Sequence, residues 1–172
     1  MTEVLVGTTV SGAIVSDDGR FRYELSRYWG GSGSGLLVWI MLNPSTADHE
    51  VDDPTIRRVV RFSKDWGYSG CVVVNLYALR AASPKELARI GLVEAAGGDE
   101  NHRHVVDASR ARDVVVAWGG HQAARERPYL RDLLAAVRAN ARSVRCLGVT
   151  KVHEQPRHPL YVAAVTQPEP YR

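Results

Sequence analysis

A small set of side chains suited to binding a planar ring follows four apolar stretches of this sequence. The set consists of Asn43, Pro44, Ser45, Asn75, Trp118 and His158. Amide, hydroxyl and imidazole groups can hydrogen-bond the edge of a heterocycle, and an indole can stack on its face. No Ser or Cys lies in the sharp glycine turn that presents a catalytic nucleophile. These residues therefore favour binding of a planar heterocycle over nucleophilic catalysis.

The four apolar stretches predict the strands that position these residues. Residues 36–42, 71–77, 113–118 and 143–149 are apolar runs of strand length, as expected for parallel strands that are covered on both faces. Helical patterns separate them, which implies right-handed crossovers. We expect an α/β fold with a central parallel four-stranded sheet and helices on both faces. Ligands of such sheets bind beyond the carboxyl ends of the strands, where the candidate residues lie.

An N-terminal antiparallel β-hairpin is expected to precede this core. Residues 4–15 and 21–27 alternate between apolar and polar positions on either side of a DDG turn signal. The alternation places Phe21, Tyr23 and Leu25 on one face and Arg22, Glu24 and Ser26 on the other. We expect one domain over residues 1–172, with the hairpin at 1–29 and the α/β core at 36–172.

Composition limits the class of protein. Two cysteines, Cys71 and Cys146, lie in predicted buried strands, which fits reduced thiols in a cytoplasmic protein. No signal segment and no apolar run of membrane-spanning length occurs. The chain also lacks a dinucleotide-binding fingerprint and a metal-binding cysteine cluster. We therefore predict a soluble, cytoplasmic monomer without a cofactor.

The basic residues suggest contacts with phosphate. The formal net charge is only +3, but Lys is present only at Lys64, Lys85 and Lys151, so the other basic residues are Arg. Arg suits bidentate phosphate contacts, although a GC-rich genome would produce the same bias. The candidates for phosphate or DNA binding are Thr46, Arg57, Arg80, Lys151 and Arg157. Arg57 also fits a solvated helix face.

An acidic segment before the first predicted helix has two interpretations. Asp48, Asp52 and Asp53 could ligate a divalent cation. Alternatively, Asp53 caps the helix that begins at Pro54, and its neighbours lie at the positive end of the helix dipole. The oxygen spacing matches no calcium-loop template, so we favour the cap and expect no metal.

Several motifs together resemble a known family. WIMLNPSTAD, DDPTIRR, VVVNLYALRA, SPKEL, AWGG and LGVTKVHEQPRHPLYV occur in this order from about residue 20 to the end of the chain. The set looks like the bacterial and phage family called domain of unknown function 1643. The resemblance implies a fold and no settled activity.

A more remote resemblance is to the uracil-DNA glycosylase superfamily. Its motifs are similar in order to Leu42-Asn43-Pro44, to Asn75 at a strand end, to Trp118-Gly119, and to His158-Pro159. The resemblance implies that Asn43 orients the attacking water and that Asn75 reads an extruded base. It also implies that His158 donates to the carbonyl oxygen that gains charge as the glycosidic bond breaks.

These resemblances predict a nucleobase-binding protein that acts on DNA, single- or double-stranded, as an N-glycosidic hydrolase for an unusual or mismatched base. Pro44, Ser45 and Trp118 would then line the base pocket. Two alternatives stay open: a metal-dependent enzyme acting on free nucleotides or modified bases, and a non-catalytic reader of a modified base.

Overall fold

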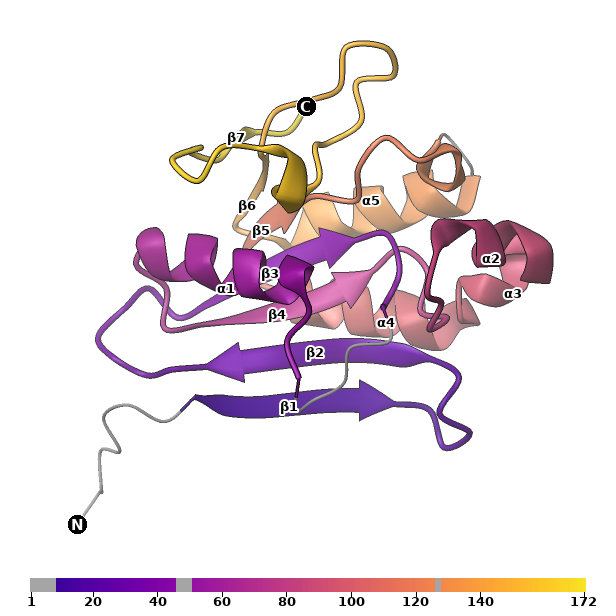
Figure 1. Ribbon diagram of the computed structural model, residues 1–172, viewed down its shortest axis with the longest axis horizontal. Coiled ribbons are helices and arrows are strands. Elements are labelled where there is room, and N and C mark those ends of the chain that lie inside the picture. The colour runs from indigo at the N-terminus through magenta and orange to yellow at the C-terminus, as the bar shows by residue number, and fades with distance from the viewer. Residues whose placement is uncertain (1–8, 46–50, 126–127) are drawn as a thin grey trace.

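The computed structural model describes residues 9–45, 51–125 and 128–172, and its strands form one seven-stranded mixed sheet. The strand order is β1-β2-β4-β3-β5-β6-β7. The strands are β1 (Val10–Val15), β2 (Arg22–Tyr28), β3 (Leu36–Met41), β4 (Gly70–Asn75), β5 (Asp113–Val116), β6 (Ser143–Cys146) and β7 (Glu169–Pro170). β4, β3, β5 and β6 run parallel, whereas β1, β2 and β7 are antiparallel to their neighbours (Figure 1).

The predicted four-stranded parallel sheet was therefore wrong in extent. Its four strands form the middle of the sheet, and the hairpin extends the sheet rather than preceding it, because β2 pairs with β4 from Leu25–Val73 to Tyr28–Gly70. β7 adds the other edge through pairs that include Cys146–Glu169. It was not expected because a two-residue strand containing a proline has no apolar pattern.

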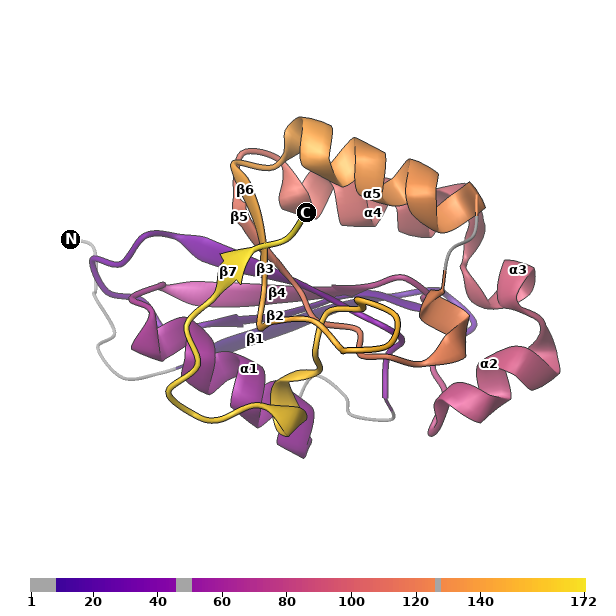
Figure 2. The same ribbon diagram turned by 90° about the horizontal axis from the view of Figure 1, so that it is seen from above.

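Helices cover both faces of the sheet (Figure 2). The described helices are α1 (Pro54–Asp65), α2 (Pro84–Ile90), α3 (Leu92–Ala95), α4 (Gly98–Ser109) and α5 (Pro128–Asn140), with 3-10 turns η1 (Gln122–Ala124) and η2 (Pro159–Tyr161). α4 and α5 pack on one face, and α1 packs on the other beside η2. No described helix has the length and apolar character needed to cross a membrane.

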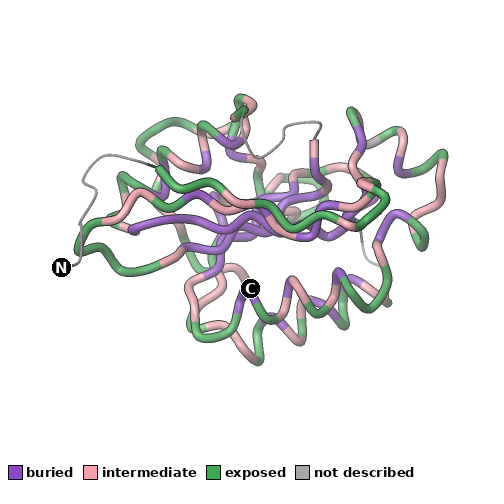
Figure 3. The backbone as a smooth tube through the Cα atoms, turned by 90° about the horizontal axis from the view of Figure 1, so that it is seen from below, coloured by how far each residue is buried: buried purple, intermediate pink, exposed green. Residues whose placement is uncertain are grey.

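Two apolar clusters, one on each face, hold these layers together. Buried residues accordingly concentrate in the central strands (Figure 3). Under α1, Trp39 stacks on Trp66 with ring centroids 5.7 Å apart, and its indole N–H donates to Ser63 Oγ over 3.0 Å. Cys71 and Cys146 are both buried free thiols. The carboxyl ends of β3 and β4 lie side by side, since Met41 of β3 pairs with Asn75 of β4.

The hairpin departs from the predicted alternation at one position. Ile14 pairs with Glu24 and Val15 pairs with Arg22, so Tyr23 is an extra residue in β2, which is a β-bulge. Arg22 is consequently only 3% exposed, although a regular strand would have turned it to the polar face.

Candidate functional site

A pocket of about 340 Å³ lies at the carboxyl ends of β3, β4 and β5. Its lining includes Arg22, Asn43, Ser45, Asn75, Trp118 and His158. Five of these six were predicted from the strand-end rule, and the structure brings them to one cavity. Arg22 was missed, because no sequence pattern marked the bulge that redirects it.

Asn75 forms a polar spot deep in this pocket. Its side chain is 1% exposed, and neither Oδ1 nor Nδ2 has a hydrogen-bond partner among the described residues. Its main chain is fixed, because Asn101 Nδ2 on α4 donates to the carbonyl oxygens of Asn75 over 3.0 Å and Leu76 over 3.4 Å. A buried amide without partners costs about 1–3 kcal/mol. A ligand that accepts from Nδ2 and donates to Oδ1 would recover that cost.

Asn43 presents one end of its amide to the pocket. Its Nδ2 donates to Pro44 O over 3.0 Å and to Ala81 O over 3.2 Å. The same loop is tied by Ala81 N, which donates to Pro44 O over 3.1 Å. These bonds fix the amide nitrogen against the main chain, so Oδ1 is left as the acceptor for a ligand or a water.

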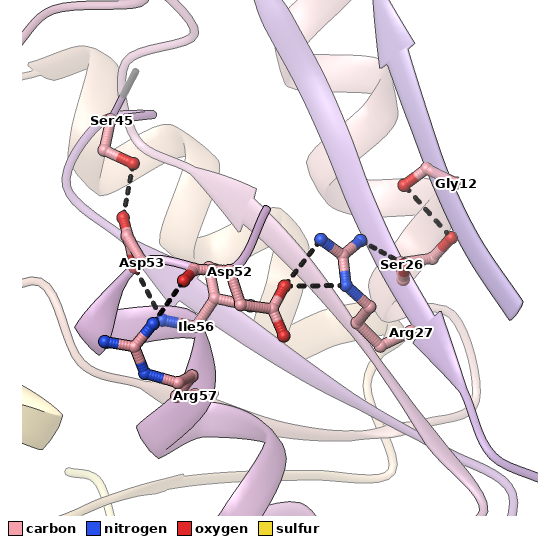
Figure 4. Close-up of polar contacts among 8 residues, drawn as sticks. All are labelled: Gly12, Ser26, Arg27, Ser45, Asp52, Asp53, Ile56 and Arg57. Atoms are coloured by element: carbon pink, nitrogen blue, oxygen red, sulfur yellow. Dashed lines mark hydrogen bonds and ion pairs between the residues drawn. The ribbon is translucent and has the colours of Figure 1, made fainter. Parts of the chain in front are cut away.

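Ser45 is held by the first turn of α1 (Figure 4). Its hydroxyl donates to Asp53 Oδ2 over 2.5 Å, while Asp53 Oδ1 accepts from Ile56 N over 2.8 Å as the helix cap. The neighbouring Asp52 accepts from Arg27 Nε and Nη2 through Oδ1, at 2.9 and 2.7 Å. These contacts tie α1 to the pocket and to β2.

His158 is the N-cap of η2, and its protonation follows from its contacts. Nδ1 accepts a hydrogen bond from Leu160 N over 3.3 Å, so the neutral ring carries its proton on Nε2. Burial lowers the pKa of His158 from its ordinary value of 6.5, and the charge of Asp53 opposes that shift. The ring is therefore neutral at pH 7 and presents an N–H donor.

Trp118 forms a fixed wall of the pocket. The indole is 3% exposed, its Nε1 donates to Gln155 Oε1 over 2.8 Å, and its ring is perpendicular to that of Tyr171 with centroids 5.9 Å apart. Next to it, Gly119 N donates to Pro156 O over 2.9 Å and joins the third strand end to the segment that carries His158. The indole N–H is thus committed to the protein, and Trp118 offers the pocket an apolar surface.

Comparison with known proteins identifies the family. Residues 22–160 match a family model described as "Protein of unknown function (DUF1643)". The chain belongs to the DUF1643 family. No curated protein and no solved structure matches it significantly. The region shared with the DUF1643 family runs from Arg22 to Leu160 and so contains every described residue of the pocket lining except Tyr161.

Four of the predicted phosphate-binding residues of this DUF1643 protein are described, and they lie outside the pocket lining. Arg57 and Arg157 are exposed and donate to main-chain oxygens of Asp52 over 2.6 Å and Val149 over 3.1 Å. Arg80 donates weakly to Gly19 O over 3.4 Å, and Lys151 is exposed. Thr46 lies outside the described residues.

The described carboxylates of the acidic segment stabilise the fold. Asp53 caps α1 and Asp52 pairs with Arg27, while Asp48 lies outside the described residues. Within the described ranges, no group of three or more His, Cys, Asp or Glu side chains is placed to hold a metal ion.

Proposed function

We propose that this DUF1643 protein binds a nucleobase extruded from DNA and hydrolyses its N-glycosidic bond, in the manner of the uracil-DNA glycosylase superfamily. The observation that carries the proposal is the amide of Asn75, which is buried at the pocket with both polar atoms unpartnered among the described residues. A pyrimidine or purine edge offers a neighbouring donor and acceptor, which is the complement of an amide.

Each of the other polar groups has a role in this reaction. Asn43 Oδ1 accepts from a water and orients it, because its Nδ2 is fixed by Pro44 and Ala81. His158 donates from Nε2 to a carbonyl oxygen of the base, because its Nδ1 is occupied. Trp118 and Met41 give apolar contact to the ring.

The bond changes balance without a cofactor. The water oxygen attacks the sugar C1′, the bond from C1′ to the base nitrogen breaks, and its electron pair passes to the base. The negative charge on the base oxygen is stabilised by the His158 N–H. An amide cannot accept the proton of the water, so that proton passes to solvent. The mechanism therefore favours bases that leave easily, and we expect slow turnover.

Substrate access requires the base to leave the duplex. The pocket is concave and the glycosidic bond is buried inside stacked DNA, so a base must be extruded to reach it. Leu160 and Tyr161 follow His158 and are 42% and 81% exposed. These side chains are placed to pack against the DNA next to the extruded nucleotide.

The metal-dependent alternative has less support. The carboxylates of Asp52 and Asp53 are engaged by Arg27, Ser45 and the α1 main chain. Both would have to leave these partners to ligate a cation.

Incubation with labelled oligonucleotides tests the proposal. The substrates carry uracil, mismatched thymine, 5-hydroxymethyluracil or hypoxanthine, and alkali then cuts any strand that has lost its base. We expect scission of one substrate, which Asn43→Ala and His158→Ala abolish. Asn140→Ala on α5 and His102→Ala on α4 are the matched controls and keep the activity. Binding to one oligonucleotide without scission would instead indicate a non-catalytic reader. Absence of both would exclude the proposed DNA function.

A further inference from the structure

The N-terminal hairpin adds a buried cation to the pocket. Arg22 is the first residue of β2, is 3% exposed and lines the cavity together with Asn75 and Met41. No other element of the pocket supplies a described Lys or Arg to its lining. The hairpin therefore contributes directly to the site.

The β-bulge at Tyr23 explains how Arg22 reaches the cavity. Tyr23 stacks on His104 of α4 with centroids 4.9 Å apart, and the adjacent Glu24 contacts His104 Nδ1 over 2.7 Å. Two consecutive residues thus face the same helix, on the side of the sheet away from α1. Arg22 then projects to the α1 side, where the pocket lies. Bulges are known to redirect side chains next to functional sites.

The described charges that act on Arg22 are those of two further arginines and one carboxylate. Burial, together with the charges of Arg80 and Arg27, lowers the pKa of Arg22 to about 10, and the charge of Asp53 opposes this shift. A pKa of about 10 still leaves the guanidinium charged at neutral pH. Among the described residues, Asp53 is an opposing charge near Arg22, and its two oxygens accept from Ser45 Oγ and Ile56 N.

We propose that Arg22 binds an oxyanion of the pocket's ligand, either a carboxylate on the base or a phosphate on the nucleotide. A guanidinium presents paired N–H donors that match the two oxygens of either group. A cavity of about 340 Å³ falls at the lower end of the range of roughly 300–1,000 Å³ for small-molecule sites, so a substituted base fits. This inference rests on the proposed function in that it takes the pocket to bind a base.

Calorimetric titration with matched ligand pairs tests the inference. Orotate against uracil measures the effect of a carboxylate on the base. Thymidine 5′-monophosphate against thymidine measures the effect of a phosphate. We expect the anionic member of one pair to bind at least tenfold more tightly to the wild-type protein, and the pair that shows this effect identifies the source of the oxyanion.

Three variants assign that preference to Arg22. Arg22→Met should remove it, and Arg22→Lys, which keeps the charge without the fork, should reduce it several-fold even if Arg22→Met does not fold. Arg20→Met is the matched control on the same hairpin, because Arg20 is exposed and pairs with Glu94. His104→Ala releases the bulge from outside the pocket and should also weaken the preference, whereas His102→Ala should not.

The outcomes separate this inference from the proposed function. Equal binding of both members of each pair, a preference that survives Arg22→Met, or no binding of any of the four probes overturns the inference. An Arg22-dependent preference without action on any oligonucleotide leaves the inference standing and removes the DNA function. Scission of an oligonucleotide without any preference for the anionic probes supports the DNA function and overturns the inference about Arg22.

Discussion

Arg58 of α1 donates a 2.6 Å hydrogen bond from Nη2 to the main-chain oxygen of Val162, the residue that follows η2. The same guanidinium lies over the ring of Phe62 at 5.0 Å. Helix α1 therefore holds both sides of the pocket mouth, since its cap Asp53 binds Ser45 and its second turn binds the segment that carries His158.

Removing the Arg58 contact should loosen that segment. In Arg58→Met the loss of a charged hydrogen bond worth about 1.5 kcal/mol leads us to expect roughly tenfold faster hydrogen exchange at Leu160 and Tyr161. Hydrogen exchange measured by mass spectrometry on peptides spanning 156–165 checks this. Arg61→Met is the control, because Arg61 is exposed and its described ion pair is a long one, 3.5 Å from Nε to Asp65 Oδ2 within the same helix. Equal exchange in both variants would show that Arg58 does not position the segment.

Asn75→Leu should increase stability while it removes ligand binding. The buried amide makes no side-chain hydrogen bond to the described residues, so replacing it with an apolar side chain is expected to raise the unfolding free energy by about 1 kcal/mol. Asn101→Leu is the contrasting variant, because it removes the donor to Asn75 O and Leu76 O, and should lower the same quantity by about 2 kcal/mol. Urea denaturation measures both. A strong loss of stability in Asn75→Leu would show that the amide serves the fold rather than a ligand.

Sequence reasoning located the central strands because each is a continuous apolar run. It also placed Asp53 as the cap of α1, which accepts from Ile56 N. The strand-end rule brought Asn43 and Asn75 together because β3 and β4 are parallel neighbours whose last residues, Met41 and Asn75, pair. Such features depend on local apolar patterning and on topology, and both can be read from a sequence.

Other features depend on contacts that no local pattern encodes. The bulge at Tyr23 exists because two residues contact His104, which lies 80 positions from Glu24. The arginines expected to meet phosphate include Arg57 and Arg157, which fold back onto main-chain oxygens. A charge pattern marks such residues as polar without indicating which acceptor each guanidinium will meet.

The ion pair between Arg27 and Asp52 should contribute more than a surface pair. The side chain of Arg27 is 4% exposed and that of Asp52 is 32% exposed, so Asp52→Ala leaves a buried guanidinium without this carboxylate. We expect the unfolding free energy to fall by about 2–3 kcal/mol. Glu94→Ala breaks the pair between Arg20 and Glu94, whose side chains are 51% and 53% exposed, and should lower the unfolding free energy clearly less than Asp52→Ala does. Thermal and urea unfolding of both variants test this, and similar losses would argue against it.

The pKa of His158 tests whether its ring is neutral in the folded protein at pH 7. Because burial disfavours the charged ring, the pKa in the folded protein lies below 6.5. The unfolded chain therefore binds the proton first, so this group's contribution to stability is complete above pH 6.5 and is lost as the pH falls through the lowered pKa. Proton and nitrogen NMR of the imidazole, assigned with His158→Gln, should show a pKa below 6.5 and a proton on Nε2.

Removing the charge of Asp53 should change the pKa of His158 measured in the same NMR experiment. Asp53 raises the pKa of His158 against the effect of burial, so Asp53→Asn should lower it further. Asn remains a good helix cap, and α1 should stay formed. A titration above pH 6.5 would contradict the effect of burial on His158. A neutral ring protonated on Nδ1 would contradict the hydrogen bond from Leu160 N and leave the pocket without an Nε2–H donor from His158. An unchanged pKa in Asp53→Asn would instead show that solvent screens the two groups from each other.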